Sequence, residues 1–320
     1  MSGARPGVPP AVAGMALVAM AAVLWGSSAA AVRVFTDETG ASGVVVAFAE
    51  AVIAAPLLLA AGAATRRAWP PLRVAAPAAL GTGVLVSGFL VAYFTAIGIV
   101  GVTIASVIAI CSAPLFTSVL ARIFLHERPS RATMVALGTG VAGTALVLVS
   151  HGDAGVGGGD RLGGVVLSLL AGLCFGGENV LVRRLVASID PTKLAALTTL
   201  AMVLLLAPPA LAQGGVVSDS IQGWPWLLYL AVFPTAIAPA LHNAGLRRVP
   251  AIPASIIGLL EPLTATALGL LVFDEAIGPA GMLGASLLLG ALVLLSLPQR
   301  EPADAGRVAD EPARSSEGSA

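Results

Sequence analysis

The chain has 320 residues, of which 57% are hydrophobic and 11% are charged, and its mean hydropathy is +0.95. So few polar residues cannot cover the surface of a water-soluble protein of this size. The apolar segments also lack the charged stripe that helices of a soluble protein carry. A formal net charge of zero gives no reason to expect a nucleic-acid partner. Cys111 and Cys174 lie in apolar runs and offer neither a disulfide framework nor a metal site. The chain is therefore predicted to be an integral protein of the lipid bilayer.

Apolar stretches long enough to cross a bilayer recur along the chain, separated by polar or turn-forming breaks such as 36–40 and 126–129. None alternates polar and apolar residues as the strands of a membrane barrel do. The predicted fold is therefore an all-α membrane protein with ten transmembrane helices. These stretches are 11–33, 43–62, 74–97, 103–125, 132–150, 163–186, 194–211, 226–246, 252–273 and 279–297.

From Ala96 onward the second half of the chain repeats the first at a fixed offset of 148 residues, so that Pro114 matches Pro262 and Glu127 matches Glu275. The first helices of the two copies align at an offset of 150, so that Trp25 matches Phe175. A repeat of half the chain, built around a proline in an apolar run, is typical of secondary transporters. The predicted units are an N-terminal cytoplasmic segment 1–10, a first five-helix repeat 11–150, a second five-helix repeat 160–297 and a disordered cytoplasmic tail 298–320.

Basic residues predict the orientation of these helices. If the N-terminus is cytoplasmic, fifteen of the seventeen Lys and Arg residues lie inside, and only Arg33 and Arg161 lie outside. Because each repeat has an odd number of spans, the second repeat must enter the membrane from the opposite side. The sequence therefore predicts an inverted repeat in a multi-pass protein of the cell (inner, cytoplasmic) membrane, with both termini cytoplasmic.

Three short patterns are found in the repeats. They are Trp25-Gly26-Ser27, the stretch that carries Pro114 and closes at Glu127, and Glu261-Pro262 in the ninth stretch. Together they resemble the EamA family of the drug/metabolite transporter superfamily. The resemblance covers about residues 12–297. It implies ten helices, cytoplasmic ends and the movement of small metabolites, often amino acids and commonly outward. The chain departs from the family at Glu50, because second helices of the family often carry an arginine instead.

Pro114 and Pro262 lie near the middle of their stretches. Neither has an N–H group, so the carbonyls of Ile110 and Gly258 lose their helical donors. Free carbonyls at membrane depth are typical of a substrate site at a repeat interface. The alternative is a kink that helps the bundle to pack.

Glu261 is the sharpest single candidate, because a carboxylate at the bilayer centre is costly and requires a partner or a proton. It is predicted to couple export to proton influx, to bind a substrate amine, or to hydrogen bond a neighbouring helix as a structural residue. Glu50 and the pair Glu178-Asn179 lie within other apolar stretches and are predicted to line the path. Glu178 matches Ser28 in the first copy, so it belongs to one half only.

His242 lies toward the cytoplasmic end of the eighth stretch, where a histidine can carry protons near neutral pH or serve as a structural residue near water. Tyr93 and Trp25 offer aromatic surface to the apolar part of a substrate, with packing or interface anchoring as the alternative. Glu127 and Glu275 stand at the mouths of their helices, which favours hinge, capping or gate roles.

Glycines recur in the helices that follow each matched glutamate, at Gly138, Gly140, Gly143, Gly281, Gly284 and Gly290. Small residues allow close approach of helices, so these are predicted to serve packing, with a homodimer as a second use.

Nucleotide-binding, zinc-protease and serine-hydrolase motifs are absent from the sequence, so neither an ATP-driven pump nor an enzyme is indicated, and no cofactor is expected. The predicted function is a gradient-coupled exporter of small metabolites, such as amino acids or amphipathic compounds, that works by alternating access around a midplane cavity. The alternatives are an importer of the same substrates and a membrane enzyme that acts on lipid-linked substrates.

Overall fold

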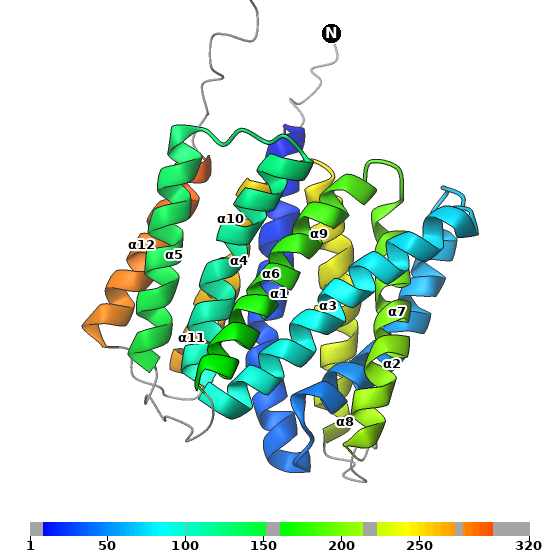
Figure 1. The fold of residues 1–320 in the computed structure, drawn as a ribbon, viewed down its shortest axis with the longest axis horizontal. Coiled ribbons are helices and arrows are strands. Elements are labelled where there is room, and N and C mark those ends of the chain that lie inside the picture. The colour runs from blue at the N-terminus through cyan, green and yellow to red at the C-terminus, as the bar shows by residue number, and fades with distance from the viewer. Residues whose placement is uncertain (1–8, 101, 152–160, 214–222, 273–277, 297–320) are drawn as a thin grey trace, which may run out of the picture.

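The computed structural model describes residues 9–100, 102–151, 161–213, 223–272 and 278–296. Every regular element in these ranges is a helix, and the helices lie side by side in a tilted bundle (Figure 1). The predicted all-α fold is therefore confirmed. The first half contains α1 (Pro10–Thr39), α2 (Gly43–Ala64), α3 (Leu72–Val100), α4 (Val102–Phe124) and α5 (Arg131–His151).

The second half follows the same order, but two of its segments are interrupted. The π-helix η2 (Ala231–Ile237) lies between two α-helices, and a one-residue break at Leu259 separates two others. The elements are α6 (Arg161–Leu185), α7 (Pro191–Ala212), α8 (Trp224–Leu230), η2, α9 (Ala238–Leu246), α10 (Ala251–Gly258), α11 (Leu260–Val272) and α12 (Pro279–Ser296).

Within the described residues, seven helical segments are long and apolar enough to cross a membrane. The remaining predicted stretches are also helical, as α4, α5 and α12, and the apolar parts of α4 and α12 are the shorter segments Ile108–Phe124 and Pro279–Leu294. The chain is a multi-pass membrane protein. The seven segments are Pro10–Val32, Gly43–Ala64, Leu72–Ile97, Arg161–Leu185, Pro191–Ala212, Trp224–Leu246 and Ala251–Val272.

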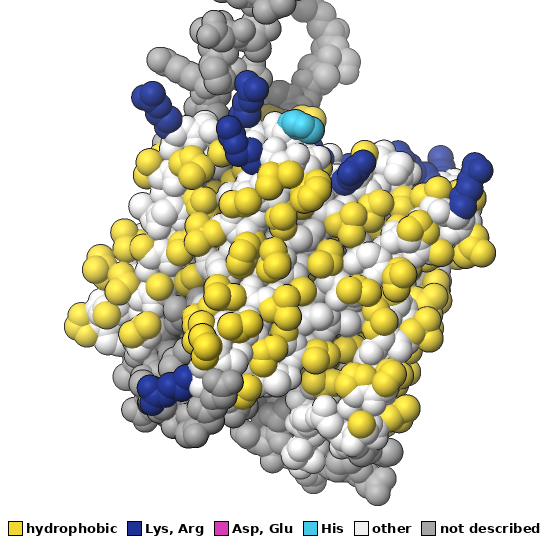
Figure 2. Space-filling view, in the orientation of Figure 1, with side chains coloured by type: hydrophobic (Ala, Val, Ile, Leu, Met, Phe, Trp, Pro, Cys, Tyr) yellow, Lys and Arg dark blue, Asp and Glu magenta, His cyan; other side chains and the backbone are white. Residues whose placement is uncertain are grey.

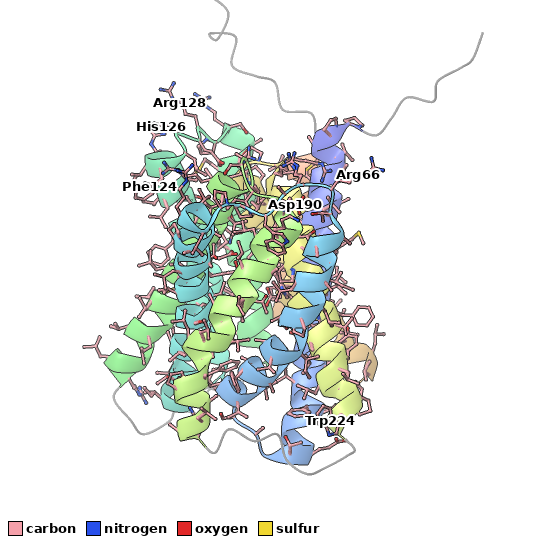
Figure 3. All side chains as sticks on the ribbon, turned by 90° about the vertical axis from the view of Figure 1, so that its right-hand side faces the viewer. Arg66, Phe124, His126, Arg128, Asp190 and Trp224 are labelled. Atoms are coloured by element: carbon pink, nitrogen blue, oxygen red, sulfur yellow. The ribbon has the colours of Figure 1, made fainter. Side chains whose placement is uncertain are left out.

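The surface of the bundle is apolar along its sides and basic at one end. Figure 2 shows hydrophobic side chains over the whole visible flank, with Lys and Arg gathered mainly at the upper end. Leu271 is 81% exposed, as expected for a side chain that contacts lipid rather than water. Arg66 and Arg128 lie at the basic end, and Trp224 lies at the opposite end (Figure 3).

Equivalent helices of the two halves run in opposite directions. The third helix of the first half, α3, follows Arg66 and so starts near the basic end, whereas its counterpart α8 starts at Trp224 at the other end (Figure 3). This is the geometry that an odd number of spans in each copy demands.

The two halves exchange packing partners. Helix α1 packs against α9, α10 and α11 of the second half, and α6 packs against α3 and α4 of the first half. Two further contacts pair equivalent helices, α2 with α7 and α5 with α12, and α3 also packs against α7. A Cβ atom on Gly143 of α5 would lie 2.7 Å from the Gly284 carbonyl oxygen of α12, so this glycine serves close packing as predicted. A Cβ atom on Gly138 or Gly290 would meet nothing within 4 Å, so the packing prediction is wrong for these two glycines.

A buried lysine ties α7 to the end of α2. Lys193 is 1% exposed, and its ammonium donates to the carbonyl oxygen of Gly62 and, at 2.7 Å, to the hydroxyl of Thr65. The ammonium also lies 4.7 Å from the ring centre of Trp69, a cation–π contact. Lys193 is one of the fifteen basic residues predicted in the cytoplasmic loops and helix ends, and the structure places it in the first turn of α7 with its side chain buried.

Candidate functional site

The first residues of interest are two repeat mates that meet. Trp25 on α1 and Phe175 on α6 occupy equivalent positions in the two copies, and their rings make an edge contact with centres 6.4 Å apart. Residues that a two-fold relation superimposes can touch only near its axis. Trp25 and Phe175 therefore mark the centre of the interface between the repeats.

Other aromatic rings extend this contact into a continuous series across four helices. Phe89 on α3 stacks on Phe175 at 5.3 Å and on Tyr93 at 5.5 Å between ring centres. On the other side, the ring of His242 on α9 lies 5.1 Å from Trp25. We call these five residues the central aromatic array. It includes three predicted candidates, Trp25, Tyr93 and His242.

Polar contacts fix the orientation of the array. His242 Nε2 lies 2.9 Å from Asn179 Oδ1, and the amide nitrogen of Asn179 donates to the Phe175 carbonyl oxygen at 3.0 Å. Trp25 Nε1–H donates to the Pro234 carbonyl oxygen at 3.0 Å. The structure thus brings the predicted residues Asn179, His242 and Trp25 into one set of contacts.

The Pro234 carbonyl belongs to the π-helix η2, where the backbone bonding pattern is loosened. Single turns of π-helix are frequent at functional sites, because they redirect side chains and carbonyls. In η2 the hydroxyl of the next residue, Thr235, lies within hydrogen-bonding reach of the carboxyl group of Glu50 on α2. One turn earlier, the Tyr229 hydroxyl lies 2.6 Å from that of Ser27 on α1. Glu50 therefore joins the array through the π-helix.

Glu261 lies beside Trp25 through a close backbone contact. A Cβ atom on Gly26 of α1 would collide with the Glu261 carbonyl oxygen of α11. The second copy repeats this contact, since a Cβ atom on Gly176 of α6 would lie 2.8 Å from the Ala113 carbonyl oxygen of α4. The carboxyl group of Glu261 is also within electrostatic range of the Tyr93 hydroxyl.

The two prolines behave differently, although the sequence predicts equivalent acceptors. Helix α4 continues through Pro114, whereas the equivalent segment breaks at Leu259, directly after Gly258 and before Pro262. The side chain of Ile110 packs against the apolar cluster formed by Leu259 and Leu288. The break is thus confined to the second copy.

Comparison with known proteins agrees with this architecture. The sequence profile of the EamA-like transporter family matches residues 12–149 and 162–297. The chain belongs to this family. Two EamA-like repeats therefore cover most of the transporter, and the resemblance noted in the sequence is confirmed.

Individual relatives of this EamA transporter carry the same general description. It is 29% identical over 210 residues to the uncharacterized transporter YwfM of Bacillus subtilis, covering 65% of this chain and 70% of that protein. It is 25% identical over 182 residues to an uncharacterized transporter of Archaeoglobus fulgidus, covering 57% of this chain and 63% of that protein. A solved crystal structure matches the fold with a TM-score of 0.74 at 20% identity, over 89% of this chain and 97% of that one.

In this transporter, Glu127 joins the two repeats at the basic end. Its carboxylate accepts hydrogen bonds from the backbone N–H groups of Ala251 at 2.8 Å and Ile252 at 3.2 Å, at the start of α10. His126, with φ of 56°, adopts the left-handed conformation between α4 and this glutamate. The predicted capping role of Glu127 is confirmed, and its mate Glu275 lies outside the described residues.

Replacing Glu127 with alanine is expected to destabilise the protein by about 1–2 kcal/mol, because two backbone donors lose a charged acceptor. Thermal unfolding of the detergent-purified protein measures the loss. Glu38, exposed at the far end of α1, provides the matched control Glu38→Ala. Equal melting temperatures for the two variants would contradict the capping role.

Some parts of the site were not predicted from the sequence. Phe89 and Thr235 are ordinary members of apolar stretches, and nothing in their spacing distinguishes them from packing residues. Phe175 was visible only as the repeat mate of Trp25. Pro234 in the eighth stretch was a usable signal for irregular backbone. Glu178 was predicted, and the structure places it 9% exposed on α6 beside Asn179.

Proposed function

We propose that the transporter is a gradient-coupled exporter of small amphipathic metabolites, with the central aromatic array at its substrate site. The observation that carries the proposal is the meeting of Trp25 and Phe175 at the repeat interface. The bundle also contains the carboxyl groups of Glu50 on α2, Glu178 on α6 and Glu261 on α11. Ionisable residues inside a membrane bundle are typical of substrate or proton pathways.

The proposal includes the topology. Ten transmembrane helices form two inverted repeats, 11–150 and 160–297, and the basic end with both termini faces the cytoplasm of a cell membrane. The opposite directions of α3 and α8 support the inversion. Alternating access then takes place by rocking of one set of helices against the other, around the axis marked by the array.

Transport by the full chain in proteoliposomes tests the proposal. Vesicles are loaded with a panel of amino acids and small amines, a pH gradient is imposed in either direction, and release is followed by mass spectrometry, with protein-free vesicles as the control. Export requires that at least one compound leaves faster when protons flow inward against it. Movement only along with the proton would favour the importer. A modified lipid headgroup without any solute movement would favour the enzyme.

A further inference from the structure

One nitrogen of His242 has no hydrogen-bond partner. The side chain is 3% exposed, and Nδ1 is one of the few buried polar side-chain atoms without a partner in the described part of the chain. An unpaired buried polar atom costs free energy, so such atoms are rare and often mark a functional site. Its other nitrogen, Nε2, is already occupied by Asn179.

The neighbouring contacts assign the tautomer of the imidazole. The amide nitrogen of Asn179 is used to donate to the Phe175 carbonyl oxygen, so the Asn179 atom that faces His242 is the oxygen Oδ1, which can only accept. Nε2 must therefore carry the hydrogen. In a neutral ring, Nδ1 is then a bare acceptor. A cationic ring would instead bury a charge with an unpaired donor, which costs more.

The surroundings of this acceptor select a cationic donor group. Glu50, Glu178 and Glu261 come from three different elements near the array, and Glu50 is linked to it through Thr235. The guanidinium of Arg183, one helical turn after Asn179, donates to the Leu246 carbonyl oxygen at 2.6 Å and is thus already paired. At Nδ1 of His242, an ammonium group would find a lone pair and carboxyl groups on neighbouring elements.

We propose that Nδ1 of His242 accepts a hydrogen bond from the primary ammonium group of the transported compound, whose apolar body lies against the central aromatic array. The site is thus specific for amphipathic amines. This inference rests on the proposed function. In the described conformation Nδ1 is covered, with the Trp25 ring against the imidazole, so the amine reaches it in another state of the transport cycle.

The test uses two ligands of equal charge. Protonated 2-phenylethylamine has N–H donors, whereas its trimethylated derivative, 2-phenylethyltrimethylammonium, has none. Equilibrium binding of radiolabelled 2-phenylethylamine to the full chain in nanodiscs, and its competition by the second compound, give both affinities. The wild type is expected to bind the amine about tenfold more tightly, the effect of one good hydrogen bond. No saturable binding of the amine, or equal affinities, overturns the proposal.

Two variants separate recognition from structure. Asparagine places a carbonyl oxygen near the position of Nδ1 but cannot reach Asn179, whereas glutamine keeps a donor toward Asn179 and loses the acceptor at Nδ1. His242→Asn is expected to retain the preference for the amine, and His242→Gln to lose it, with about tenfold weaker amine binding. A purely structural histidine gives the reverse order, which overturns the proposal.

Binding is measured without a gradient, so the two proposals fail in different ways. A preserved ligand preference without transport in proteoliposomes contradicts the transport proposal alone. Transport of 2-phenylethylamine that is equally fast in the His242→Asn and His242→Gln variants contradicts the role of Nδ1 alone.

Discussion

Transport by a Glu261→Gln variant is expected to be independent of the pH gradient. Glutamine has nearly the same shape as glutamate, and the backbone contact between residue 261 and Gly26 is unchanged by the replacement. An amide cannot take up or release a proton, so the coupling route through this position is lost. Gradient-driven transport should fall at least about tenfold, as is usual when a proton-transfer group is removed. Solute flux in proteoliposomes with and without a pH gradient measures the effect.

Two further variants, one control and one neighbouring residue, accompany this measurement. Glu38→Gln changes an exposed carboxyl group at the end of α1 and should leave the pH profile unchanged. The hydroxyl of Tyr93 is within electrostatic range of Glu261, so Tyr93→Phe tests whether the phenol takes part. A normal rate and a normal pH profile in Glu261→Gln would remove Glu261 from the mechanism.

Gly26→Ala is expected to disrupt both stability and transport. The added Cβ would collide with the Glu261 carbonyl oxygen and would lie 2.6 Å from the Thr264 Cβ, so α1 and α11 must separate. Overpacking of this kind costs about 1–3 kcal/mol. The repeat mate Gly176→Ala should behave similarly, because its Cβ would lie 2.9 Å from the Thr117 nitrogen. Thermal unfolding in detergent and flux in proteoliposomes measure the two effects.

Gly138→Ala is the matched control for these variants. A Cβ atom at Gly138 meets nothing within 4 Å, so the substitution adds only the helix preference of alanine and should be neutral or stabilise by up to about 1 kcal/mol. A melting temperature of Gly26→Ala equal to that of Gly138→Ala would show that the close approach of α1 and α11 is not required.

The helical fold could be predicted from the sequence because lipid permits few alternatives, and an apolar run of span length is helical almost by necessity. The asymmetry of the proline segments was harder to predict. Both Pro114 and Pro262 remove a donor, but the residue four positions earlier is Ile110 in one copy and Gly258 in the other. Glycine is a poor helix former, which is consistent with the break in the second copy alone.

The site was predicted only in part for a similar reason. The repeat offset showed that Trp25 and Phe175 are equivalent, but their ring contact depends on how the two copies pack together, which no local pattern encodes. His242 was visible as a polar residue in an apolar stretch. Its bare nitrogen follows from Asn179, which is 63 positions away in the chain. Isolated polar residues were thus predictable as candidates, but their partners were not.

The exchange of packing partners has a consequence for biosynthesis. Helix α1 is made well before its main partners α9, α10 and α11, so its buried face waits until most of the second half has been synthesised. A truncated product that ends after α5 has no surface on which α1 can complete its packing. We therefore expect a single repeat to be degraded when expressed alone, and two separately expressed repeats to accumulate only when both are present in the same cell.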